Sequence, residues 1–225
     1  MADSETVALV GSDTLLGREV RDIVTTSGAA LDLRLIAADE EEPGSLTRLG
    51  DEAAILSGLN EDAISGTRAV ILAGSAEFSR KALELAGDPP DVAIIDLTFT
   101  AEERPDARLR APMVEAEGED FSDAAVHVIA HPAAIALALF LRRLHANDEI
   151  RRAIVQIFAP ASEHGTRGVE ELQQQTVNLL SFKSMPQAVF DSQLSFNLLA
   201  RYGEEAPVSL RIGFAGKLKG LAGCC

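Results

Sequence analysis

A turn that contains two glycines near the start of the chain has residue types and spacing that suit a dinucleotide. Residues 6–10 form a short apolar, β-rich run, Gly11 and Gly17 follow it, and apolar residues then recur at helical spacing. A strand that enters a helix through such a turn offers free backbone N–H groups to a pyrophosphate. Gly11 is expected to allow the tight turn and Gly17 the close packing of helix on strand.

The turn departs from the usual fingerprint at its centre. Thr14 stands where a middle glycine lets the backbone approach the phosphates, and Asp13 adds a negative charge. A turn that no longer binds nucleotide therefore remains an alternative. The predicted cofactor contacts are Gly11, Ser12, Asp13, Thr14, Leu15, Leu16, Gly17, Asp39, Ala73 and Gly74.

Four consecutive acidic residues, 39–42, follow the second apolar run at 31–38. An acid at the end of this strand suits the ribose 2′-hydroxyl of NAD, and several acids would repel the 2′-phosphate of NADP. If either NAD or NADP binds, NAD is the favoured cofactor. The alternative is that 39–42 is a solvated acidic loop.

The order of the expected elements predicts an α/β fold with a Rossmann-type parallel sheet over about 5–130. Continuous apolar runs alternate with helical patterns, as in a sheet that is covered on both faces. Strands are predicted at 6–10, 31–38, 69–73, 92–97, 125–129 and 150–158, helices at 15–24, 78–85, 133–145 and 169–180, and a loop-rich crossing at 98–123.

The composition narrows the class of protein. The chain has 225 residues, 47% of them hydrophobic, and a formal net charge of −15 at pH 7. That charge argues against nucleic acid and anionic membranes as partners, and no apolar run is long enough to span a membrane. The acidic N-terminus lacks the pattern of a signal peptide, so a cytoplasmic protein is expected. Cys224 and Cys225 are the only cysteines, and the histidines stand singly, so neither a disulfide framework nor a metal site is predicted.

Several further segments occur in a recognisable order. They are the turn at 10–17, Ala73-Gly74-Ser75, Ile94-Ile95-Asp96, the run 129–132, Ser162 with 165–172, and 193–197. In this order and spacing, from about Thr6 to Leu199, the chain resembles the aspartate-semialdehyde dehydrogenase family. Within that family, it resembles the paralogues that lack the catalytic cysteine.

The resemblance implies a domain organisation and a reaction. It implies a Rossmann domain that binds NAD(P) at 1–130 and a partial α+β domain for dimerisation and catalysis at 131–225, with an atypical tail at 207–225. The family reaction is the reductive dephosphorylation of β-aspartyl phosphate with NADPH. A thiolate attacks the acyl phosphate, and hydride then reduces the thioester.

The departures from the family pattern concern catalysis. Ala134 occupies the position of the family nucleophile, and a methyl group cannot form a thioester. Ala133 and Ala159 replace a family asparagine and glutamine, and Arg104 is the nearest candidate for a displaced substrate arginine. The chain ends before the family's catalytic histidine and a further arginine.

No replacement nucleophile is evident in the sequence. His131 and His164 fall near the inferred cleft, but a single histidine is usually structural, and Ser162 has no base beside it. No catalytic residue is therefore predicted.

Several functions remain open. The chain could be an NAD(P)-binding, dimerising scaffold without dehydrogenase chemistry, or a non-catalytic partner of a true homologue. It could also be an active semialdehyde dehydrogenase of amino-acid biosynthesis, or a truncated product with a diverged tail. A homodimer or a heterodimer through the second domain is expected, because 150–196 is rich in apolar residues.

Overall fold

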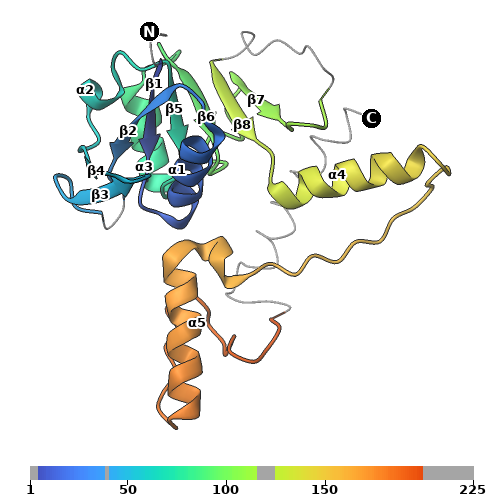
Figure 1. Ribbon diagram of the computed structural model, residues 1–225. Helices are drawn as coiled ribbons and strands as arrows, with labels where there is room; N and C mark the ends of the chain where they lie inside the picture. The colour runs from blue at the N-terminus through green and yellow to red at the C-terminus, as the bar shows by residue number, and fades with distance from the viewer. Residues whose placement is uncertain (1–4, 39–40, 116–124, 200–225) are drawn as a thin grey trace. The chain divides into compact units, whose positions relative to one another are not determined.

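A computed structural model describes residues 5–38, 41–115 and 125–199 of the chain (Figure 1). The chain divides into two compact units, Met1–Ala130 and His131–Cys225. The first unit is built on a parallel sheet, and the described part of the second consists of helices and extended segments. No helix in the described ranges is long and apolar enough to cross a membrane.

The first unit contains a six-stranded sheet, and the parallel sheet predicted from the apolar runs is confirmed. Its order is β2-β1-β5-β6-β8-β7, and every neighbouring pair is parallel. The chain passes from β1 to β2 on one side and to β5 on the other, so the strand order reverses beside the end of β1. Ligands bind at such a reversal in open α/β sheets. The strands are β1 (Glu5–Val10), β2 (Leu31–Ile36), β5 (Ala69–Leu72), β6 (Ala93–Asp96), β7 (Ala107–Arg110) and β8 (Val126–Ile129).

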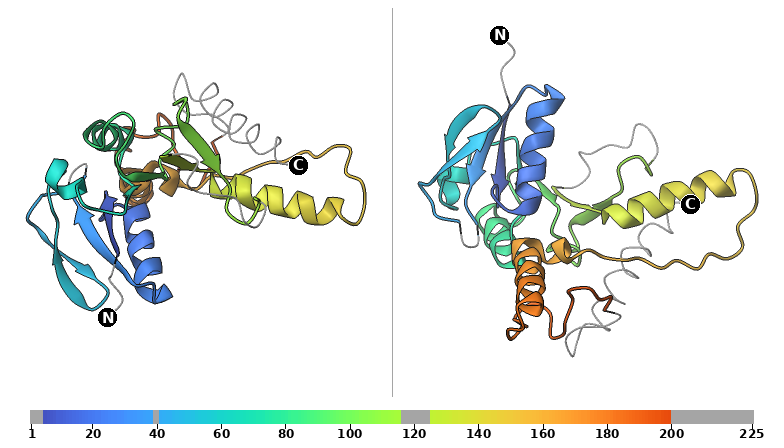
Figure 2. Two further views of the ribbon diagram at one scale, coloured as in Figure 1. Left: turned by 90° about the horizontal axis from the view of Figure 1, so that it is seen from above. Right: turned by 60° about the horizontal axis from the view of Figure 1, so that its bottom comes forward.

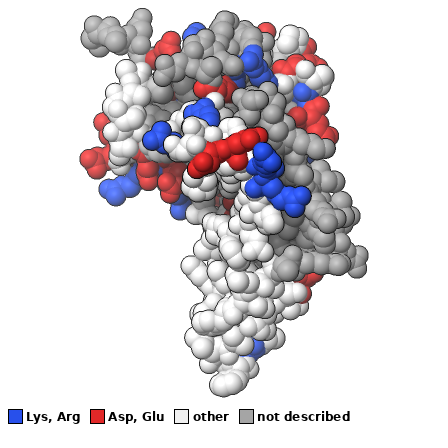
Figure 3. Space-filling view, turned by 90° about the vertical axis from the view of Figure 1, so that its right-hand side faces the viewer, with Lys and Arg blue, Asp and Glu red and all other residues white. Residues whose placement is uncertain are grey.

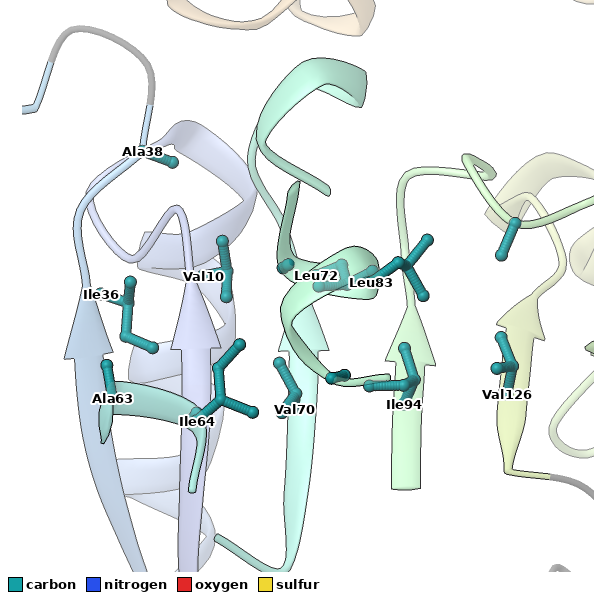
Figure 4. Packing of buried hydrophobic residues seen from close by; sticks show 14 of the residues in the cluster. Val10, Ile36, Ala38, Ala63, Ile64, Val70, Leu72, Leu83, Ile94 and Val126 are labelled. Atoms are coloured by element: carbon teal, nitrogen blue, oxygen red, sulfur yellow. The ribbon is translucent and has the colours of Figure 1, made fainter. Parts of the chain in front are cut away.

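Helices cover both faces of the sheet because apolar side chains alternate between its two sides along each strand. On one face, α1 (Leu15–Ser27) and the hairpin of β3 (Leu46–Leu49) and β4 (Glu52–Ile55) pack over a cluster that includes Leu9. On the other, α2 (Glu61–Ile64) and α3 (Ala76–Leu85) pack over a cluster that includes Val10 (Figure 2). Figure 4 shows this second cluster, in which strand side chains meet those of α2 and α3.

Two parts of the first unit differ from the sequence-based prediction. The hairpin β3–β4 and the short helix α2 were not predicted, and β7 lies inside the segment predicted to be a loop-rich crossing. β7 is an edge strand in which two arginines alternate with apolar residues, so its sequence lacks the apolar run of a central strand. Its Arg110 is fully buried; its Nε lies 3.2 Å from His127 Nδ1, and its Nη1 lies 3.5 Å from Glu115 Oε2.

The second unit contains two predicted helices, and both are confirmed. They are α4 (Pro132–His145) and α5 (Gly165–Leu180), the latter preceded by a 3₁₀ turn, η2 (Ala161–His164). α5 begins four residues before its predicted start at Val169, and a Cβ atom on Gly168 would collide with the carbonyl oxygen of Ala161 in the preceding turn.

The strand predicted at 150–158 is wrong. Residues 151–160 lie between α4 and α5 as an extended segment, and in the described residues no strand pairs with it (Figure 1). A β-strand is stable only when a neighbouring strand satisfies its N–H and C=O groups, so an apolar, β-branched run alone does not suffice. Its side chains are accordingly exposed, with Ile154 at 90% and Phe158 at 73% of full exposure.

A buried pair on α5 organises the chain that follows this helix. The carboxylate of Glu171 accepts the backbone N–H groups of Ala188 and Val189 at its Oε2 and of Phe190 at its Oε1, over 2.7–2.9 Å. Gln175, one turn later, donates to Pro186 and accepts from Leu194 over 2.9 and 2.7 Å. The two side chains therefore hold 186–195 beside α5.

Candidate functional site

The turn between β1 and α1 is shaped by glycines. Gly11 has a φ of +80°, and a Cβ atom there would lie 2.5 Å from the backbone nitrogen of Gly74. A Cβ on Gly17 would collide with the carbonyl oxygen of Gly11. Only glycine satisfies both the left-handed conformation and this close approach. The sequence prediction for Gly11 and Gly17 as packing glycines thus agrees with the local geometry.

Thr14 ends the turn and starts the helix. Its hydroxyl oxygen accepts from Gly17 N over 3.0 Å, which caps α1. The same hydroxyl lies 2.8 Å from the carbonyl oxygens of Gly11 and Ala73, so it can donate to either. The side chain that was expected to crowd a phosphate is thus committed to the helix cap and to the β5 end of the sheet.

Asp13 carries the negative charge that the sequence placed beside the anion site, and the fold compensates it. Its Oδ1 lies 2.7 Å from Nη1 of the largely buried Arg21 and accepts from the Thr47 hydroxyl over 2.9 Å. Arg18 lies 4.0 Å from the same oxygen. The carboxylate of Asp13 is therefore paired below the turn.

Glu41 turns back toward the glycine turn. Its Oε1 accepts the backbone N–H of Asp13, and its Oε2 accepts that of Ala38, each over 3.0 Å. The carboxylate thereby bridges the glycine turn and the end of β2. The acidic run is thus not wholly a solvated loop, although Glu42 is exposed and Asp39 lies outside the described residues.

The remaining predicted contacts lie around the same end of the sheet. Ser12 is fully buried, Ala73 donates its N–H to Val10, and Gly74 packs against Gly11. Leu15 and Leu16 open α1, and within the described chain their N–H groups have no protein acceptor. The fold thus brings together the predicted contacts that the structure describes.

A cavity of about 590 Å³ lies between the segment that follows β2 and helix α3, and Glu41 is one of its lining residues. One side is apolar, with Phe78 and Leu85 of α3, and the rim carries Glu61 and Glu84. Lys81 lies 4.7 Å from the centre of the Phe78 ring. The lining residues are Ala37, Glu41, Pro43, Leu59, Glu61, Phe78, Lys81, Glu84 and Leu85.

The region predicted to lack catalytic chemistry lies in the second unit, at the start of α4. Ala134 is buried in the first turn of this helix and exposes 1% of its surface. His131 caps the helix: its Nδ1 accepts the N–H of Ala133 over 3.1 Å, and its Nε2 lies 3.2 Å from Glu163 Oε2. Because Nδ1 is an acceptor, the proton of neutral His131 is on Nε2, which then donates to Glu163.

Two other residues singled out in the sequence also have structural partners. Arg104 forms a two-pronged ion pair with Asp106, over 2.9 and 2.8 Å, and lies 3.3 Å from Asp88. This hydrogen bonding to Asp106 raises the pKa of Arg104. Arg104 therefore has its carboxylate partners within the protein, which weakens its candidacy as the substrate arginine. His164 contacts the Phe190 ring edge-on, with 5.3 Å between ring centres.

Sequence reasoning missed the contacts of two carboxylates. The sequence analysis considered Glu41 only as a member of the acidic run 39–42. It considered Glu171 only as a member of the family segment 165–172, and it predicted no contact for either residue. Burial raises the pKa of Glu171, but the N–H groups of Phe190, Val189 and Ala188 outweigh this effect and leave it lowered. The only signal in the sequence was an acid close to a strand end in one case and inside an apolar helix pattern in the other.

No protein-family model matches the chain, but sequence comparison finds aspartate-semialdehyde dehydrogenases and USG-1 protein homologs that are similar to it. An aspartate-semialdehyde dehydrogenase of Rickettsia bellii is 24% identical over 207 residues, or 91% of this chain and 60% of the relative. That of Aquifex aeolicus is 27% identical over 197 residues, covering 86% and 57%. A USG-1 protein homolog of Pseudomonas aeruginosa is 27% identical over 207 residues, covering 90% and 60%. The chain thus spans about 60% of the length of these relatives.

Solved structures share the fold. A probable aspartate-semialdehyde dehydrogenase of Pseudomonas aeruginosa superposes with a TM-score of 0.76 at 21% identity, over 98% of this chain and 67% of that one. Aspartate semialdehyde dehydrogenase II of Vibrio cholerae, solved in complex with ASA, gives a TM-score of 0.73 at 20% identity, over 91% and 62%. Sequence and fold together relate this chain to the aspartate-semialdehyde dehydrogenases.

Proposed function

We propose that the chain is a dinucleotide-binding scaffold of the aspartate-semialdehyde dehydrogenase type that lacks the thiol chemistry of those enzymes. The observation that carries this proposal is the contrast between a turn at 11–17 that keeps Gly11 and Gly17 and a buried methyl group at 134. The turn also has a helix cap at Thr14, and the N–H groups of Leu15 and Leu16 could bind an anion. The position of the family nucleophile has no sulfur or oxygen atom that could attack a carbonyl.

NAD is the favoured cofactor of this scaffold. Glu41 brings a carboxylate to the end of β2, where the ribose 2′ substituent of a dinucleotide comes closest to the protein. A 2′-hydroxyl can donate to that carboxylate, whereas a 2′-phosphate meets a like charge. The cavity beside Phe78 offers room for the adenine.

Calorimetric titration with NAD and NADP, next to a turnover assay, tests the proposal. The expected result is saturable binding of NAD, weaker binding of NADP, and no reduction of either cofactor in the presence of L-aspartate β-semialdehyde and phosphate. Turnover on the order of 1 s⁻¹ or faster would show an active enzyme. If neither cofactor binds while the protein unfolds cooperatively, the dinucleotide part of the proposal is wrong.

A second candidate function, association with another subunit, rests on the exposed apolar side chains of the second unit. Residues 151–160 and the α5 region expose large hydrophobic side chains: Ile154, Val155, Ile157, Phe158, Val177, Leu180, Phe182, Phe196 and Leu198. The lower part of Figure 3, where α5 lies, carries few charged side chains on the face in view. Soluble monomers rarely expose so much apolar surface. The partner is a second copy of this chain or a full-length homologue.

Light scattering at micromolar concentration tests this association. A discrete dimer, or a discrete complex with a co-expressed homologue, is expected. A single monomeric species that remains monomeric beside the homologue would contradict it.

A further inference from the structure

We propose that Glu41 fills an anion site of the protein's own making, and that removing its carboxylate opens this site to a phosphate group. The site consists of the backbone N–H groups of Asp13 and Ala38. The inference rests on the proposed nucleotide binding and narrows it, because it names the group that decides which nucleotides the turn accepts.

The two N–H groups come from different parts of the chain and meet at one carboxylate. Asp13 belongs to the turn after β1, and Ala38 follows β2, yet each donates over 3.0 Å to a separate oxygen of Glu41. Hydrogen bonds to a charged acceptor are shorter and stronger than those between neutral groups. Two convergent backbone donors of this kind also hold phosphate oxygens in proteins. The carboxylate thus occupies the position of an external anion.

The Glu41 carboxylate competes well with an external phosphate because the chain holds it close to Ala38. Only two residues separate it from Ala38, so its carboxylate is present at a high effective concentration. An external phosphate must displace it or approach it against its charge. Asp13 contributes less to this repulsion, since Arg21 lies 2.7 Å from its carboxylate.

The position of the site at the end of β2 affects which ribose 2′ substituent the protein accepts. Ala38 N–H lies at the end of β2, near which the 2′ substituent of a bound adenosine ribose is held in this fold. With Glu41 in place, ligands with a 2′-hydroxyl are accepted and ligands with a 2′-phosphate are refused. Without it, the same two N–H groups are available to the phosphate.

Amide NMR of the full chain can follow these two groups directly. The probes are inorganic phosphate, adenosine 5′-monophosphate and adenosine 2′,5′-bisphosphate. The variants are Glu41→Ala, which removes the carboxylate, and Glu41→Gln, which keeps its size and one acceptor oxygen. Glu42→Gln is the matched control, because it removes an exposed charge from the same run. Thermal unfolding verifies that each variant is folded.

In the wild-type chain and in Glu42→Gln, phosphate is expected to leave the Asp13 and Ala38 amide resonances in place. In Glu41→Ala both resonances should shift, and the affinity for adenosine 2′,5′-bisphosphate should rise about tenfold or more over wild type. Glu41→Gln should show a smaller rise in the same direction.

Two results overturn the inference. They are no response of these two amides to phosphate in folded Glu41 variants, and an equal response in the wild-type chain. If phosphate shifts the amides in Glu41→Ala but no nucleotide binds any variant, the anion site stands and the proposed function falls. If nucleotides bind but phosphate does not shift the two amides in Glu41→Ala, the proposed function stands and the anion site is refuted.

Discussion

The starts of α1 and α4 make an instructive pair. At α1, the groups that would hold a ligand are backbone atoms, arranged by Gly11, Gly17 and the Thr14 cap. At α4, the resemblance predicts the family nucleophile at position 134, where the buried side chain is a methyl group. A binding turn made of backbone survives substitution at neighbouring side chains, whereas a nucleophile is lost with one residue. The proposed function, nucleotide binding without the family reaction, follows this difference.

The two helix starts also differ in the side chain that accepts their backbone N–H groups. Glu41 places a carboxylate on the turn before α1, while His131 caps α4 through its Nδ1 and reaches Glu163 through its Nε2. In the first arrangement, the Glu41 carboxylate occupies the position that an external anion such as phosphate would take. The second satisfies the backbone N–H of Ala133 with a ring nitrogen of His131.

Gly11→Ala should break the first helix start and has the largest expected effect. The substitution combines a φ of +80° with a Cβ atom 2.5 Å from Gly74 N, and it should lower the free energy of unfolding by about 3 kcal/mol or more. Urea unfolding measures this loss. Gly28→Ala is the control, because Gly28 has a φ of +68° but nothing within 4 Å of the added atom; it should cost only about 1 kcal/mol. Equal losses would show that the close approach at Gly11 is unimportant.

Glu171→Gln tests whether a carboxylate on backbone N–H groups also stabilises the second unit. The variant should lose roughly 2 kcal/mol, because hydrogen bonds to a charged acceptor are replaced by weaker ones. The pKa of Glu171 is lowered from 4.5 in the folded protein. Its contribution is therefore present above pH 4.5 and is lost as the pH falls through the folded-state pKa.

The variant should accordingly show less loss of stability in acid than the wild-type chain does. Unfolding curves at several pH values below neutrality measure the difference. Glu170→Gln, an exposed neighbour on the same helix, should leave both stability and its pH dependence close to wild type. If the two variants behave alike, segment 186–195 does not depend on Glu171.

Thr14→Ala tests the contribution of the N-cap side chain to the start of α1. It removes the hydroxyl that accepts from Gly17 N and should cost about 1 kcal/mol in stability, with weaker nucleotide binding. Thr14→Ser keeps the hydroxyl and should retain both properties. Thermal unfolding and calorimetry provide the readouts. Tighter nucleotide binding in Thr14→Ala would mean that the Thr14 side chain obstructs the ligand.

Ala134→Cys should have no effect on turnover, although it restores the family atom. The N–H groups of the first turn of α4 would favour a thiolate, but the family asparagine and glutamine positions remain Ala133 and Ala159. The assay follows NADPH formation from L-aspartate β-semialdehyde and phosphate. Measurable recovery in this single variant would show that the thiol alone was missing.

The central strands of the sheet were predictable, and the physical reason is burial on both sides. Runs such as 69–73 are apolar throughout because no face of the strand meets water. β7 escaped prediction because an edge strand with two arginines has no such run. The hairpin β3–β4 escaped for a similar reason, since its strands are short and partly exposed. The segment 150–158 shows the converse error, because strand formation also requires a partner.

The site was predictable only where it is local. The glycine turn follows from a short stretch of sequence in which each residue acts on its neighbours. The contact of Glu41 with Asp13 spans 28 positions, and that of Glu171 with Phe190 spans 19. Such contacts depend on the completed fold, and a single sequence gives no measure of which acid in a run turns inward.

The segment 151–160, which pairs with no strand of the described chain, is the part on which we expect a protease to act first. Proteolytic enzymes bind substrates as extended backbone, and exposed connecting segments are their preferred sites of nicking. Here the extended form already exists, and Arg151 and Arg152 offer exposed cationic side chains to enzymes that cleave after them. Cleavage at this segment needs no prior opening of the sheet or of either long helix. The lifetime of the intact chain in a cell would then depend on whether a partner covers this segment, and not on the stability of the Rossmann-type sheet.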